Sequence, residues 1–106
     1  MKKYGLHGKL SATAGNGDKL AAILLKASKL VSTAKGCHLY LVSKDKNTPD
    51  AVWVTEVWDS KEDHDNSLAV AGVRELIAQA MPLLAGMPEK GQELEILGGA
   101  GINQQQ

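Results

Sequence analysis

The chain has 106 residues, and its 12 Lys and Arg side chains balance 12 Asp and Glu side chains, so the formal net charge is zero. This length predicts one domain, and without a basic run interleaved with aromatic residues a nucleic-acid partner is not expected. The longest apolar runs are far shorter than the ~20 residues that a membrane-spanning helix needs, so we expect a cytoplasmic protein with no membrane insertion.

The first predicted element is a strand. Apolar and polar side chains alternate over residues 4–12, with a break at Gly8. A period of two places the apolar side chains on one face of a strand and His7 on the other face.

An amphipathic helix is predicted after a Gly-rich turn at residues 15–18. Apolar side chains recur at helical spacing over residues 20–34, while four lysines fall off that stripe. Asn16 or Asp18 is available to cap the start of this helix, and Gly36 is expected to end it. The apolar face of the helix needs a sheet to pack on.

Two strands are predicted next, at residues 37–45 and 51–58, joined by a hairpin-like loop. The first of them groups His38 and Tyr40 on one face. The second holds both tryptophans of the chain, Trp53 and Trp58, on opposite faces. Neither face of this second strand is polar throughout, which is typical of a central strand covered on both sides.

A second helix is predicted to begin at Ser60, because Asp63 three residues later gives the form of a capping box. This helix carries His64, and Gly72 is a weak point within its apolar pattern. Pro82 predicts a kink or the end of the helix near residue 80, because proline removes a backbone donor and clashes with the preceding turn.

A short last strand is expected at residues 93–97. The order strand-helix-strand-strand-helix-strand is a duplicated split βαβ unit, which predicts an α+β, ferredoxin-like fold with a four-stranded antiparallel sheet. We expect residues 1–98 to form this domain and residues 99–106 to be a flexible tail. Helices on one face of the sheet would leave an apolar face of residues 51–58 in water, which predicts a homodimer.

Two segments resemble the antibiotic biosynthesis monooxygenase (ABM) family, which includes quinol monooxygenases. They are EVWDSKEDHDNSL, residues 56–68, and VRELIAQAMPLLAG, residues 73–86. The resemblance implies a dimeric α/β barrel of ferredoxin-like subunits. It also implies a monooxygenase that oxidises a quinol, hydroquinone or polyphenol with molecular oxygen and with no metal or flavin cofactor.

The resemblance places Trp58 and His64 at the border of a cavity between sheet and helices, with Glu56 and Arg74 at less discriminating positions. Oxidation of a phenol begins with loss of its proton, so His64 is the candidate base, and Trp58 would stack on the ring. The alternatives are a solvated or packed histidine for His64, a core side chain for Trp58 and a solvated helix residue for Arg74.

Three more residues are candidates for the same cavity. His38 and Tyr40 share a strand face and would point into the cavity together, His38 as a second catalytic group and Tyr40 as a substrate contact. His7 is a further substrate contact. The alternatives are a subunit interface or sheet edge for His38 and Tyr40, and solvent or a partner sheet for His7.

Two other functions stay open. The same fold supports a non-catalytic small-molecule carrier or sensor. Relatives that degrade haem have a first-strand Asn and an iron-coordinating His where this chain has His7 and Leu68, which disfavours haem degradation but leaves haem binding at His64 open. No metal site is predicted, because Cys37 is alone and no histidine has a second ligand at metal-binding spacing on a helix.

Overall fold

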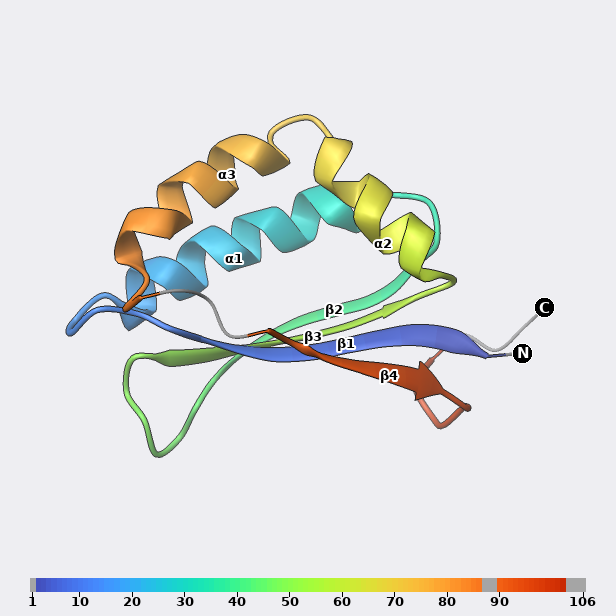
Figure 1. The fold of residues 1–106 in the computed structure, drawn as a ribbon, viewed down its shortest axis with the longest axis horizontal. Coiled ribbons are helices and arrows are strands. Elements are labelled where there is room, and N and C mark those ends of the chain that lie inside the picture. Colours follow the sequence, from blue (N-terminus) through green and yellow to red (C-terminus); the bar gives the residue numbers. More distant parts are fainter. Residues whose placement is uncertain (1, 87–89, 103–106) are drawn as a thin grey trace.

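The computed structural model describes residues 2–86 and 90–102 of the chain. Within these ranges four antiparallel strands form one sheet in the order β2-β3-β1-β4, and the helices lie on one face of it (Figure 1). The strands are β1 (Lys3–Ser11), β2 (Cys37–Lys44), β3 (Ala51–Trp58) and β4 (Gln92–Ile96). The helices are α1 (Gly17–Val31), α2 (Lys61–Asn66) and α3 (Val73–Ala80), with short 3-10 helices η1 (Ser67–Ala69) and η2 (Met81–Leu83). This arrangement confirms the predicted α+β, ferredoxin-like fold.

The central strand β3 carries its two tryptophans on opposite faces of the sheet. β3 pairs with β1 on one side and with β2 on the other. Trp58 is fully buried in the core under the helices. Trp53 lies on the face without helices, where the His7 ring stacks on it with ring centroids 4.8 Å apart.

The expected alternation in β2 is wrong at the first residues of the strand. Cys37 pairs with Trp58, but the register shifts before Leu39, so His38 is the extra residue of a bulge. Cys37 consequently packs with Tyr40 in the core cluster around Trp58 instead of sharing a face with Leu39. The bulge also separates His38 from the alternating row that contains Tyr40.

Helix α1 begins close to the predicted position, but its cap comes from a distant residue. Asn16 occupies the N-cap position without a side-chain hydrogen bond to the helix. The Asp50 carboxylate, in the loop between β2 and β3, accepts from the backbone N–H groups of Gly15 at 3.1 Å and Gly17 at 2.9 Å. The bond to Gly17 satisfies one of the backbone donors in the first turn that have no partner within the helix, and the bond to Gly15 fixes the turn that precedes it.

The end of α1 comes earlier than predicted, at Val31 rather than near Gly36. Hydroxyl side chains here donate to backbone carbonyls three residues earlier, which competes with continuation of the helix. These side chains are Ser28, Ser32 and Thr33. Gly36, with a φ of +85°, then turns the chain into β2.

The region predicted as one helix after Ser60 consists of several pieces. The Asp63 backbone N–H donates to Ser60 Oγ at 3.1 Å, which confirms the predicted start of α2. Gly72 adopts a φ of +92° at the N-cap of α3 and separates α3 from η1. α3 ends at Ala80, shortly before Pro82, as predicted.

Two clusters of buried apolar residues form the core between the sheet and the helices. One is built around Leu20 and Val52, and the other around Val31, Trp58 and Val73. In the described ranges no helix is long and apolar enough to cross a membrane. The domain boundary at residue 98 stays a prediction, and residues 103–106 of the expected tail lie outside the described residues.

Candidate functional site

A cavity of about 250 Å³ lies between the sheet and the helices, with residues of both core clusters in its walls. Most of the lining is apolar and comes from the predicted helical stripes. These residues include Leu20, Ile23, Leu24, Val73, Leu76 and Ile77. The polar residues of the lining are Tyr40, Glu56, His64 and Ser67. The cavity is therefore an apolar space with one polar region.

Three apolar side chains line the cavity and are also exposed to solvent. Leu68 is 43% exposed, Ile77 42% and Met81 51%. They lie along the segment from η1 to η2, so the cavity opens to solvent beside α3.

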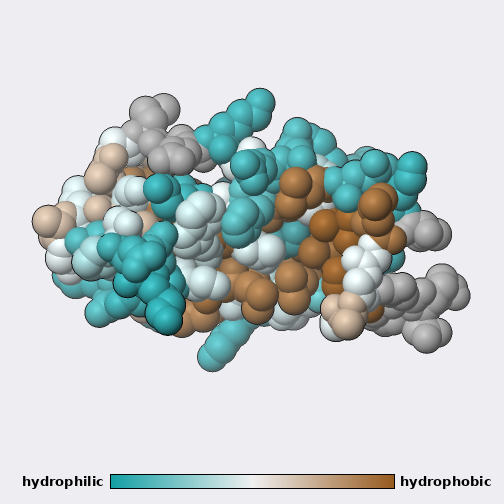
Figure 2. Space-filling view, turned by 90° about the horizontal axis from the view of Figure 1, so that it is seen from below, coloured by the Kyte–Doolittle hydropathy of each residue, from teal (hydrophilic) through white to brown (hydrophobic). Residues whose placement is uncertain are grey.

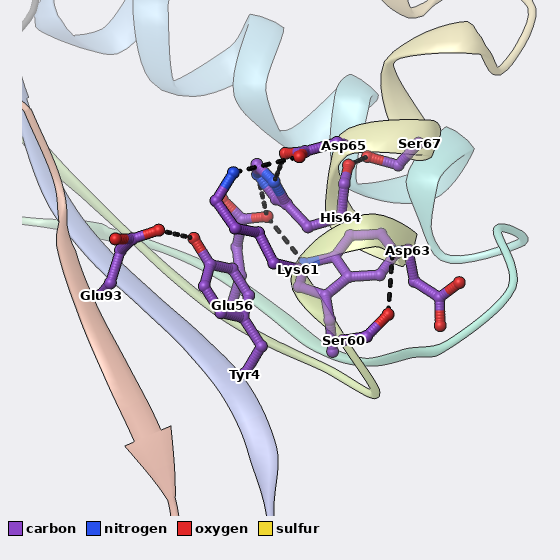
Figure 3. Close-up of polar contacts among 10 residues, drawn as sticks. Tyr4, Glu56, Ser60, Lys61, Asp63, His64, Asp65, Ser67 and Glu93 are labelled. Atoms are coloured by element: carbon purple, nitrogen blue, oxygen red, sulfur yellow. Dashed lines mark hydrogen bonds and ion pairs between the residues drawn. The ribbon is translucent and has the colours of Figure 1, made fainter.

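Glu56 on β3 is the buried acidic group of the site. The residue is 9% exposed, and its Oε1 atom accepts a hydrogen bond from Trp58 Nε1 at 3.0 Å. The Nε2 atom of His64 lies 3.7 Å from the same oxygen (Figure 3). Burial raises the pKa of Glu56, and the Trp58 hydrogen bond and the proximity of His64 only partly oppose this rise.

His64 on α2 is held between a carboxylate and a ring. Its Nδ1 atom lies 3.0 Å from Asp65 Oδ1, and the Trp58 ring meets the imidazole edge-on at a centroid distance of 5.8 Å. Because an ionised carboxylate only accepts hydrogen bonds, Nδ1 carries the hydrogen, which leaves Nε2 on the side of Glu56. The hydrogen bond from His64, followed by that from Lys61, lowers the pKa of Asp65.

Tyr40 on β2 is the cross-strand partner of Glu56 and also lines the cavity. Burial, followed by the nearby Glu56, raises the pKa of Tyr40. Within residues 2–86 and 90–102, no hydrogen bond holds its hydroxyl group. The other tyrosine, Tyr4, donates its hydroxyl to Glu93 Oε2 at 2.8 Å and is not among the lining residues (Figure 3).

The structure brings Tyr40, Glu56 and His64 together and places the other predicted site residues elsewhere. Trp58 is fully buried and packs behind Glu56 and His64 without lining the cavity. The remaining three are His7, on the open face of the sheet, His38, whose Nε2 lies 2.6 Å from Asp59 Oδ1, and Arg74, exposed on α3.

Two residues that hold His64 were missed by the sequence reasoning. Asp65 binds the imidazole, and Ser67 Oγ donates to the backbone carbonyl of His64 at 2.6 Å. A carboxylate directly after a helical histidine was the available signal for Asp65. Across the described part of the chain, no group of three or more His, Cys, Asp or Glu residues could hold a metal ion.

Comparison with known proteins gives a family and several related folds. The model of the antibiotic biosynthesis monooxygenase family matches residues 4–79. The chain is similar to a Chloroflexus aurantiacus protein that carries the same family name, at 44% identity and a TM-score of 0.86 over 95% of this chain and 99% of that one. No curated protein sequence matches the chain.

Two more distant solved structures share the fold. A Nitrosomonas europaea protein of unknown function is 23% identical, with a TM-score of 0.76 over 93% of each chain. A Caulobacter crescentus protein with the same family name is 18% identical, with a TM-score of 0.80 over 91% of each chain. At these identities the similarity concerns the fold alone.

Proposed function

Since this chain belongs to the antibiotic biosynthesis monooxygenase family, we propose that it oxidises a quinol, hydroquinone or polyphenol with molecular oxygen. The observation that carries the proposal is the apolar cavity with His64, Glu56 and Tyr40 in its wall. An apolar pocket with a few converging polar groups suits a flat ring that bears a hydroxyl group.

His64 is the proposed base. Its Nδ1 atom is held by Asp65, so Nε2 is the nitrogen that can take the proton from a substrate hydroxyl. Histidine suits this step because its ordinary pKa lies near neutrality. Trp58, buried behind the imidazole, keeps the ring in place rather than stacking on the substrate.

The electrons for oxygen reduction come from the substrate in this proposal. Loss of the hydroxyl proton leaves an electron-rich anion that can transfer an electron to oxygen. One oxygen atom then replaces a ring hydrogen, and the other leaves as water with two hydrogens from the substrate. A quinol thus becomes a hydroxyquinone, and this balance requires no metal, flavin or external reductant.

A second copy of the chain is the proposed partner. Apolar side chains gather on the open face of the sheet, as the brown areas in Figure 2 show. We define the open-face patch as Leu39, Leu41, Trp53, Leu94 and Ile96. Leu41 is 50% exposed and Leu94 is 46% exposed, so packing against the same face of a second copy would remove apolar area from water.

Oxygen uptake by the purified protein with a panel of hydroquinones tests the proposed reaction. We expect a rate above that of uncatalysed oxidation for at least one compound, with one atom of labelled oxygen in the product. His64→Gln should lower the enzymatic rate by about a hundredfold or more, as expected for loss of a general base. His38→Gln is the matched control and should leave the rate unchanged, because His38 lies outside the cavity.

Two outcomes would contradict the proposal. Uptake at the uncatalysed rate for every compound would argue against an oxygenase, and equal rates for the His64 and His38 variants would argue against His64 as the base. In the first case, ligand-dependent quenching of Trp58 fluorescence in a Trp53→Phe background, with the ligand recovered unchanged, would identify a carrier or sensor instead.

A further inference from the structure

The Tyr40 hydroxyl is a hydrogen-bond donor that takes no part in the proposed proton transfer to His64. Tyr40 lines the cavity, and in the described ranges its hydroxyl has no hydrogen-bond partner. Burial raises the pKa of this phenol, so it keeps its hydrogen at neutral pH. A donor of this kind is complementary to an oxygen atom of a bound molecule.

Glu56 offers a second donor next to Tyr40, because the two residues are cross-strand partners and line the same cavity. Trp58 Nε1 already donates to Oε1 of Glu56. A proton on the carboxyl group would therefore sit on the other oxygen, Oε2. Glu56 is buried beside an apolar lining that contains no Lys or Arg among the described residues, and this burial favours the neutral form and raises the pKa of Glu56.

We infer that Tyr40 and a neutral Glu56 bind the oxygen of the deprotonated substrate, while His64 receives the proton. The inference deepens the proposed function and rests on it. The substrate hydroxyl proton moves to His64 Nε2, and the electron pair of the broken O–H bond stays on the substrate oxygen. Two neutral donors in an apolar cavity stabilise that charge more than they stabilise the neutral hydroxyl.

The same geometry indicates a substrate class. No Lys or Arg in residues 2–86 and 90–102 lines the cavity, and apart from Tyr40, Glu56, His64 and Ser67 the lining is apolar. A second negative charge on the substrate would therefore be buried without a partner. We expect a hydroxylated aromatic molecule whose remaining surface is uncharged and apolar, and exclusion of phenols that carry a carboxylate.

An anaerobic binding experiment tests this inference without turnover. The probe is 6-cyano-2-naphthol, whose neutral and anionic forms absorb at different wavelengths. We expect the wild-type protein to increase the ratio of bound anion to bound neutral naphthol above the ratio in water at the same pH. Tyr40→Phe should lower the bound ratio about tenfold or more, as expected for loss of a hydrogen bond to a charged group. Tyr4→Phe is the matched control and should keep the wild-type ratio, because the Tyr4 hydroxyl binds Glu93.

Glu56 is tested by two substitutions with opposite expectations. Glu56→Gln keeps an oxygen for Trp58 and supplies an N–H donor, so it should keep the ratio within about threefold of wild type. Glu56→Leu removes the donor and should lower the ratio about tenfold or more. The carboxylated probe 6-hydroxy-2-naphthoate should bind at least about tenfold more weakly than the cyano compound.

The inference is overturned if the wild-type protein leaves the ionisation of the naphthol unchanged, or if Tyr40→Phe matches wild type. It is also overturned if Glu56→Gln loses as much as Glu56→Leu, because Glu56 would then act as a carboxylate. Tight binding of the naphthoate would contradict the substrate class. Each of these results is independent of oxygen uptake, so failure here and failure of the proposed reaction can be told apart.

Discussion

Glu56 lies in an environment that its residue type does not prefer. Acidic side chains are rarely buried unless they are paired. Among the described residues, the polar partners of buried Glu56 are a tryptophan that donates a hydrogen bond and a histidine at 3.7 Å. Strict alternation along residues 51–58 puts Glu56 on the same face as Trp58, but alternation alone does not say which face the helices cover. The proximity of Glu56 to His64 therefore depends on how α2 packs on the sheet, which the strand pattern does not predict.

The raised pKa of Glu56 predicts how stability depends on pH. In the unfolded chain a glutamate releases its proton near pH 4.5, whereas the folded protein retains the proton to higher pH. The folded state then binds more protons than the unfolded state, so the free energy of unfolding falls as pH rises from about 4.5 through the folded-state pKa. Glu56→Gln should lose this part of the pH dependence.

Urea denaturation of the wild type and the variant between about pH 4 and 8 measures the effect. Glu62→Gln, an exposed glutamate on α2, is the control and should follow the wild-type curve. If the Glu56→Gln curve ran parallel to the wild-type curve over this range, Glu56 would have its ordinary pKa in the folded protein.

Helix α2 is the element on which the site depends, because it carries His64. The helix is short, so its capping bond matters for holding His64 in place. Its start was predictable, since the residues that cap it are neighbours in sequence. The start of α1 was predictable in position but not in mechanism, because Asp50 reaches Gly15 and Gly17 from a different loop. Local sequence shows a cap only when donor and acceptor are separated by a few residues.

Ser60→Ala should lower the free energy of unfolding by about 1 kcal/mol, the usual cost of losing a helix N-cap. The physical reason is that the Asp63 backbone N–H loses the acceptor that Ser60 Oγ provides at 3.1 Å. Ser32→Ala is the matched control. It removes a serine hydroxyl that donates to the Lys29 carbonyl at the C-terminal end of α1, and it should change the free energy of unfolding by less than about 0.5 kcal/mol. Equal effects of the two substitutions in urea denaturation would show that the Ser60 bond is not a stabilising cap.

At the scale of the whole molecule, periodicity predicted the sheet layer and the helix layer but not which polar side chains line the cavity. The apolar stripes of α1 and α3 were identified from spacing, and the same stripes line the cavity. His38 was predicted to reach the cavity with Tyr40 because strict alternation was assumed. The bulge before Leu39 breaks that alternation. The residue types in this segment do not predict a bulge.

The open-face patch predicts a dimer that one charge can disrupt. Leu41→Glu should weaken self-association at least about tenfold, because a carboxylate would be buried against an apolar surface. Leu25→Glu is the matched control: Leu25 is 52% exposed on α1, against 50% for Leu41 on the sheet, and its replacement should leave association unchanged. Sedimentation equilibrium of the three proteins measures the difference, and a wild-type chain that stays a monomer at micromolar concentration would refute the dimer.

The cavity between the two core clusters also sets how the protein responds to compression. An internal void is lost when a chain unfolds, so hydrostatic pressure favours unfolding in proportion to the space that is left unfilled. A ligand that occupies the 250 Å³ between sheet and helices would remove part of that driving force. A molecule bound in this cavity should therefore raise the hydrostatic pressure needed to unfold the protein.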